Sequence, residues 1–125
     1  MKDAAGYLAH IKALIVVNPQ VVHSLDGGTR RSVRYRLTLR DGGLLEMFER
    51  FRIVKGRTQV AKYSFHWQDA AGQLRKRWDN AAHHPEVSTH PHHVHDGGEA
   101  NVLPHGPISA EEVLAIIAEE QPDLS

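Results

Sequence analysis

The feature that most constrains the fold is a strict two-residue alternation of apolar and polar side chains along two segments. In SVRYRLTLR, residues 32–40, valine, tyrosine and leucine alternate with arginine and threonine. In VAKYSFHWQD, residues 60–69, aromatic residues alternate with lysine, serine, histidine and glutamine. Successive side chains on a β-strand point to opposite faces of the sheet. Both segments are therefore predicted to be strands with one apolar and one polar face.

Short turn signals such as Asp41-Gly42-Gly43 and Lys55-Gly56 separate these segments from their neighbours in the chain. Further strands are predicted at residues 21–25, 44–54 and 73–79. Turns this short connect antiparallel strands. The sequence thus predicts an antiparallel meander of four to five strands, which needs a helix layer on only one face.

Helices are predicted at both ends of the chain. Residues 4–15 place apolar side chains on one stripe of an amphipathic N-terminal helix. Ser109 and Glu112 form a capping box at the start of a C-terminal helix over residues 109–120. Between the sheet and this helix, residues 80–107 are predicted to be a long loop rich in histidine and proline. The expected fold is a single α+β domain spanning residues 1–125.

The absence of cysteine from the sequence excludes disulfides, thiolate metal sites and a cysteine nucleophile. The apolar run at residues 13–17 is too short to cross a bilayer and lacks the form of a secretory signal. We therefore expect a cytoplasmic protein with no membrane partner.

A net charge of zero conceals a strong asymmetry between two parts of the chain. Residues 30–77 carry thirteen lysines and arginines against four acids, whereas residues 78–125 carry nine acids and no lysine or arginine. Two interpretations follow. The two surfaces attract each other within the fold, or a basic surface binds phosphate while an acidic tail shields it.

Histidines are concentrated in WDNAAHHPEVSTHPHHVH, residues 78–95, which contains six of the ten in the chain. Three roles compete for them. Imidazoles in a loop often hydrogen-bond backbone groups that lack other partners. They also bind zinc or nickel, and the His-x-His spacings suggest a site made of His90, His92, His93 and His95. Histidine is also the side chain best suited to exchange protons near neutral pH.

Acid–base chemistry by histidine suits the cleavage of RNA, which carries its own nucleophile in the 2′-hydroxyl. The reaction needs a base, an acid and cations that hold the phosphate. His66 lies on the predicted polar face, and His84 or His93 would complete the acid–base pair without metal. The phosphate would be held by Arg34, Arg36 and Lys62. Supporting roles are expected for Asp79, Asn80, His83, His92 and His95.

The combination of HWQD, RWDN, HHPE and PHHVH in this order, followed by a late SAEEVL helix, resembles the TumE family of toxins from bacterial toxin–antitoxin systems. The resemblance covers residues 63–114. It implies a small toxin thought to act as a ribonuclease and neutralised by a DNA-binding antitoxin. The matching positions are His66, Asp79, Asn80, His83, His84, His92, His93 and His95. The chain departs from the family at Ala82 and His90, where a proline and an aromatic residue are common, which argues against an essential His90.

The sequence therefore predicts the toxin of a toxin–antitoxin pair that acts as a metal-independent ribonuclease, with RNA and an antitoxin protein as partners. Two alternatives remain open. The histidine-rich segment could form a metalloprotein site, including that of a metal-dependent nuclease. The chain could also be a non-catalytic module that binds nucleic acid or a partner protein. A homodimer formed through the sheet or its edge is compatible with each of these functions.

Overall fold

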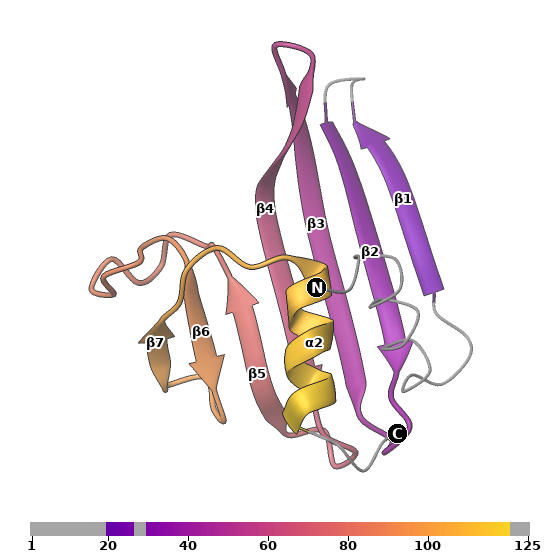
Figure 1. Cartoon of the computed structure of the whole chain (residues 1–125), viewed down its shortest axis with the longest axis vertical. Coiled ribbons are helices and arrows are strands. Elements are labelled where there is room, and N and C mark those ends of the chain that lie inside the picture. Colours follow the sequence, from indigo (N-terminus) through magenta and orange to yellow (C-terminus); the bar gives the residue numbers. More distant parts are fainter. Residues whose placement is uncertain (1–19, 27–29, 121–125) are drawn as a thin grey trace.

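A single antiparallel sheet dominates the computed structural model, which describes residues 20–26 and 30–120. Its seven strands follow one another in chain order, each paired with the next (Figure 1). The strands are β1 (Gln20–Asp26), β2 (Arg30–Thr38), β3 (Leu44–Val54), β4 (Arg57–Gln68), β5 (Leu74–Asp79), β6 (His93–Asp96) and β7 (Val102–Pro104). The predicted antiparallel meander is confirmed, because every neighbouring pair is antiparallel.

The number of strands was predicted wrongly, because the histidine-rich segment is not entirely loop. Residues 80–92 form a loop, but β6 and β7 then extend the sheet by two short strands. In β6, His93 and His95 flank Val94, and all three side chains are buried. Histidine is a polar residue, so the sequence of this strand does not show the apolar alternation that predicts a strand. The predicted N-terminal helix, residues 4–15, lies outside the described residues.

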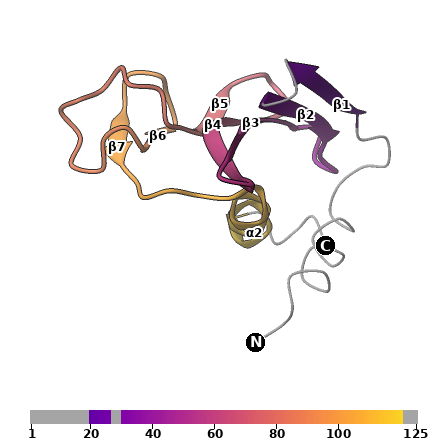
Figure 2. The ribbon, with the colours of Figure 1, turned by 90° about the horizontal axis from the view of Figure 1, so that it is seen from above.

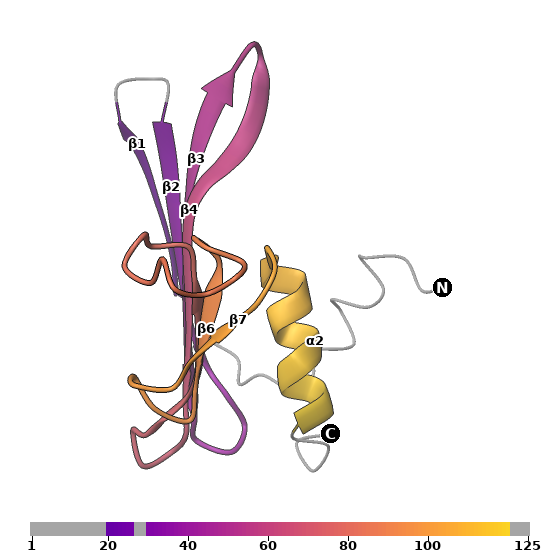
Figure 3. The same cartoon turned by 90° about the vertical axis from the view of Figure 1, so that its left-hand side faces the viewer.

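The C-terminal helix α2 (Ala110–Glu120) packs against one face of the sheet, as Figures 2 and 3 show. Its predicted capping box is present: the backbone N–H of Glu112 donates to Ser109 Oγ at 3.2 Å, and the N–H of Ser109 donates to Glu112 Oε1 at 3.3 Å. These bonds satisfy backbone donors that the first helical turn leaves open. Val113, Leu114 and Ile117 are the buried residues of α2.

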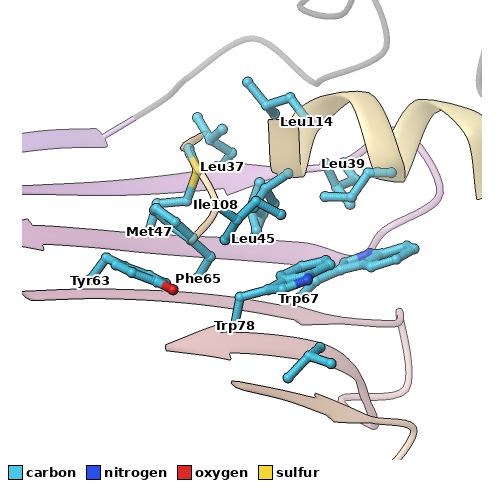
Figure 4. Close-up of a cluster of buried hydrophobic side chains, with 13 residues drawn as sticks. Leu37, Leu39, Leu45, Met47, Tyr63, Phe65, Trp67, Trp78, Ile108 and Leu114 are labelled. Carbon is cyan, nitrogen blue, oxygen red and sulfur yellow. The ribbon is translucent and has the colours of Figure 1, made fainter. Parts of the chain in front are cut away.

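The hydrophobic core lies between α2 and the sheet (Figure 4). Phe65, Trp67 and Leu45 have no exposed surface, and Trp78 from β5 is 1% exposed. These side chains occupy alternate positions on β3, β4 and β5, so the intervening residues point to the opposite face. The apolar face of each strand is thereby fixed, and a polar face remains on the side away from the helix.

Within the described part of the chain, no helix has the length and apolar character needed to span a membrane. Within the described residues, several ion pairs join the basic and acidic parts of the sequence. Lys76 Nζ lies 2.8 Å from Glu120 Oε2, and Arg77 Nη2 lies 2.6 Å from Glu99 Oε2. Attraction between the two parts is thus built into the fold, as the first interpretation of the charge asymmetry expects.

The turn between β2 and β3 depends on a glycine at residue 43. A Cβ atom there would lie 2.7 Å from the backbone oxygen of Gln68 and 3.0 Å from Asp41 Oδ1. We predict that Gly43→Ala lowers the free energy of unfolding by about 1–3 kcal/mol, because a backbone carbonyl cannot move aside easily. Urea denaturation measures the change. Gly98→Ala is the matched control, since a Cβ at Gly98 meets no atom within 4 Å, and an equal loss in both variants would contradict the steric explanation.

Candidate functional site

The register of the sheet arranges the polar face into rows of side chains that cross the strands. Cα partners in an antiparallel pair lie opposite each other, and alternate positions share a face. One row consists of Arg36, Glu46, His66, Arg77 and His95, from β2 to β6. The next row consists of Arg34, Phe48, Ser64, Asp79 and His93. Arg34, Arg36 and His66 therefore share the face that the sequence alternation predicts for them.

Three imidazoles meet at the β6 end of these rows. The ring centroids of His84 and His93, and of His93 and His95, lie 5.0 Å apart, and those of His84 and His95 lie 5.5 Å apart. Each pair is arranged edge to face, with interplanar angles of 69–73°. The side chains of His93 and His95 are 1% and 5% exposed, whereas that of His84 is 28% exposed. The loop of residues 80–92 thus brings His84 back over two buried histidines; these three residues are the histidine cluster.

Hydrogen bonds at Nδ1 orient all three rings of the cluster. His84 Nδ1 lies 2.9 Å from Glu86 Oε1, His93 Nδ1 lies 2.9 Å from the carbonyl of Pro91, and His95 Nδ1 lies 2.9 Å from the carbonyl of Glu99. A carbonyl oxygen only accepts hydrogen bonds, so Nδ1 of His93 and of His95 carries a proton and donates it. The pKa of Glu86 is lowered by a bond to its own backbone and by its bond to His84, so this carboxylate also accepts.

Asp79 joins the cluster to the sheet. Its Oδ1 lies 3.0 Å from His93 Nε2 and also accepts the backbone N–H of Ala81 at 3.0 Å. Because Nδ1 of His93 already donates to a carbonyl, a second proton lies between His93 Nε2 and Asp79. Both ring nitrogens of His93 are therefore engaged, and this buried imidazole serves to hold the site in place.

Arg77, which the sequence analysis did not select, connects the remaining members of the site. It donates from Nη2 to His95 Nε2 at 3.2 Å and from Nε to Asp79 Oδ2 at 3.3 Å. Its two terminal nitrogens each lie 2.6 Å from one oxygen of Glu99, a bidentate ion pair. Arg77 and Asp79 are two residues apart on β5 and so share a face, a signal that the sequence contained.

Two neighbouring cavities open on the polar face. The first, of about 290 Å³, is lined by the histidine cluster together with Arg77, Asp79 and His83. The second, of about 580 Å³, is lined by Arg34, Phe48, Arg50 and His66, among others. Lys62 and Ser64 line both cavities. The exposed Lys62 is therefore common to the cavity of the histidine cluster and the cavity of His66.

Several residues proposed from sequence lie elsewhere. Asn80 braces β4, because its Oδ1 accepts the N–H of Tyr63 at 3.0 Å and its Nδ2 donates to Ala61 O at 3.2 Å. His92 contacts Tyr63, with His92 Nδ1 2.8 Å from the phenol oxygen and the rings stacked at 5.8 Å. Arg36 is exposed and outside both cavities.

The metal set His90, His92, His93 and His95 is not assembled. His90 is exposed, with its Nδ1 near the backbone oxygen of His84, and His92 is turned toward Tyr63. The structure instead brings ligand atoms of His84, His93 and His95 within 4.8 Å of one another. The extended conformation of β6 explains the difference, because it places alternate residues, His93 and His95, on one face.

The histidine cluster partly fits a metal ion. Three imidazoles whose Nδ1 atoms bond to oxygen leave Nε2 for an ion, which is the usual arrangement around zinc. Two contacts oppose it. Nε2 of His95 already accepts from the Arg77 guanidinium, and Nε2 of His93 faces Asp79 with a proton between them. An ion would have to displace Arg77 and that proton.

In a comparison with known protein families, residues 7–121 match the family described as Toxin TumE. The match extends beyond the motifs of residues 63–114 on both sides. No curated protein and no solved structure matches the chain.

The burial of His92 should make stability depend on pH. Burial raises the pKa of Tyr63 to about 12, with the charge of Asp79 as a further cause. Burial and then His93 lower the pKa of His92 below its ordinary value of 6.5. As pH falls through 6.5 the unfolded chain takes up a proton before the folded chain does, so stability is lost.

We predict that His92→Gln loses less stability than the unaltered protein between about pH 7 and pH 5, because glutamine keeps a polar partner for Tyr63 without titrating. Urea denaturation at both pH values measures the difference. His83→Gln, a change at an exposed histidine, should lose as much stability as the unaltered protein over the same pH range. An identical pH dependence in the His92→Gln variant would contradict the assignment.

Proposed function

The chain belongs to the TumE toxin family, whose family model matches residues 7–121, and from this premise we propose that it is a ribonuclease that cleaves RNA without a metal ion. Membership of a toxin family implies an antitoxin partner. The observation that carries the proposal is the position of Lys62, which lines both the cavity of the histidine cluster and the cavity of His66. An exposed cation that lines the cavity of the histidine cluster and also the cavity of His66 suits a phosphodiester.

His84 and His66 are the acid and base of the proposed reaction. His84 is partly exposed, lines the cavity of the histidine cluster and bonds to Glu86 through Nδ1, which leaves Nε2 for a proton transfer. His66 Nε2 lies 3.1 Å from Gln68 Oε1, which leaves Nδ1 for a proton transfer. Each imidazole is thus oriented through one nitrogen and can exchange a proton through the other.

His93 has a different role from His84, although the two were equal candidates on sequence. Both nitrogens of His93 are engaged, by Pro91 and Asp79, and its side chain is 1% exposed. We assign it as a positioning residue that supports His84 by ring contact at 5.0 Å. Asp79 and Arg77 hold the same arrangement together from β5.

The spacing of the strands supports an in-line displacement. Attack by the 2′-hydroxyl and departure of the 5′-oxygen occur on opposite sides of phosphorus, so acid and base must face each other across it. His66 is on β4, and His84 packs against two histidines of β6; the backbones of β4 and β6 are two strand spacings, about 10 Å, apart. A phosphodiester with a hydrogen bond of about 2.8 Å on each side fits this separation. Lys62 and Arg34 would hold its charged oxygens.

A metal-dependent nuclease is the second candidate, favoured by the approach of three imidazoles within 4.8 Å. A bound zinc or nickel ion would supply a Lewis acid and an activated water at His84, His93 and His95. The two functions give different results when protein purified without an affinity tag is incubated with RNA and a chelator. Metal-independent cleavage persists and leaves 2′,3′-cyclic phosphate ends, whereas a metal-dependent nuclease stops.

We predict that His84→Ala and His66→Ala each lower RNA cleavage by about 10²–10⁴-fold, the usual contribution of a general acid or base. Gel analysis of total RNA and growth after induced expression measure the effect. His105→Ala is the control, because His105 lies outside both cavities and its Nδ1 bonds to the carbonyl of Gly106. Full cleavage by a folded His66→Ala or His84→Ala protein would refute the assignment of that residue.

A further inference from the structure

Phe48 is an aromatic residue on the polar face of the sheet. It lies between Glu46 and Arg50 on β3 and is opposite Arg34 on β2 and Ser64 on β4. The core-facing residues of the same strand, Leu45 and Met47, occupy the other parity. Phe48 is therefore directed away from the hydrophobic core, and its side chain remains partly exposed. Its position is not explained by packing against α2.

Two guanidinium groups accompany this ring. The Cζ atoms of Arg34 and Arg50 lie 5.0 Å and 5.8 Å from the ring centroid. Both groups lie over the ring as cation–π contacts, so a base that stacks on Phe48 would take the place of a guanidinium. Arg34 and Arg50 are themselves exposed, so their charges remain available to an anion. An aromatic ring with two exposed guanidinium groups over it complements a nucleotide, which joins a flat base to an anionic phosphate.

The cavity around Phe48 has room for such a ligand. Its volume of about 580 Å³ falls within the range of small-ligand sites. Arg34, Arg50 and Lys62 contribute three positive charges to its lining, against one carboxylate, Glu46. His66 lines the same cavity, so a base resting on Phe48 would be adjacent to the proposed acid–base pair.

We propose that Phe48 is a stacking platform for an unpaired base, and that the substrate is consequently single-stranded RNA. This inference rests on the proposed ribonuclease function. A base in a duplex is already stacked on its neighbours, so an aromatic side chain on a sheet selects nucleotides that are free of pairing. Arg34 and Arg50, displaced from the ring by the base, would hold the phosphates that flank it.

The test measures binding separately from cleavage. The full chain is titrated into a labelled 2′-O-methyl RNA of roughly eight nucleotides, a length within the usual site size, which lacks the attacking hydroxyl. The same RNA annealed to its complement is the second probe. Fluorescence anisotropy should give tighter binding to the single strand. Phe48→Leu should weaken that binding by roughly 5- to 100-fold, the usual effect of removing one stacking partner, and Phe48→Trp should retain it.

Tyr35→Leu is the matched control. It also removes an aromatic ring, but Tyr35 packs against the core on the opposite face of the sheet. Equal binding by Phe48→Leu and the unaltered protein, or equal affinity for single strand and duplex, would overturn the proposal. If the unaltered protein cleaves RNA but one of these two binding results is obtained, the ribonuclease function is retained and only the role of Phe48 as a stacking platform is refuted. Phe48-dependent binding without cleavage of unmodified RNA would support the platform and refute the ribonuclease.

Discussion

The carboxylate of Asp79 is the interaction on which the polar side of the molecule depends. It is buried at the end of β5, and its oxygens meet the Nε2 of His93, the Nε of Arg77 and the N–H of Ala81. A buried carboxylate is costly unless hydrogen bonds and an opposite charge compensate for lost water. The compensation here comes from β5, from β6 and from the start of the loop. One side chain thereby joins β5, β6 and the start of the loop.

Most of the sheet could be predicted from the sequence, because alternation over nine or more residues leaves little ambiguity about which face is buried. β2 and β4 follow this pattern, and the capping box of α2 is equally local. β6 and β7 were missed for physical reasons. They have four and three residues, and β6 buries imidazoles, whose contribution to a core depends on partners that are remote in sequence. Asp79, for example, lies fourteen positions before His93.

The sequence predicts most of the residues of the candidate site, but it does not predict how they are arranged. The common face of His66 and Arg34 follows from alternation alone. The meeting of His84 with His93 and His95 does not, since the loop of residues 80–92 has no periodic pattern that would indicate its path. The role of Arg77 required the register between β4 and β5, which contains an irregularity between Trp67 and Gln68. Spacing within one segment cannot reveal such a shift.

The pairing of β5 with β6 also has a consequence for how the gene can vary. Val94 faces the core, and its neighbours His93 and His95 belong to the histidine cluster on the opposite face. A slip of one residue in β6 would therefore put an imidazole into the core and an aliphatic side chain into the cluster. Insertions or deletions near this strand would thus damage folding and chemistry together. Length changes should accumulate instead in tips such as the β3–β4 hairpin, where the chain extends past α2 (Figure 1) and the side chains of Ile53 and Val60 are exposed.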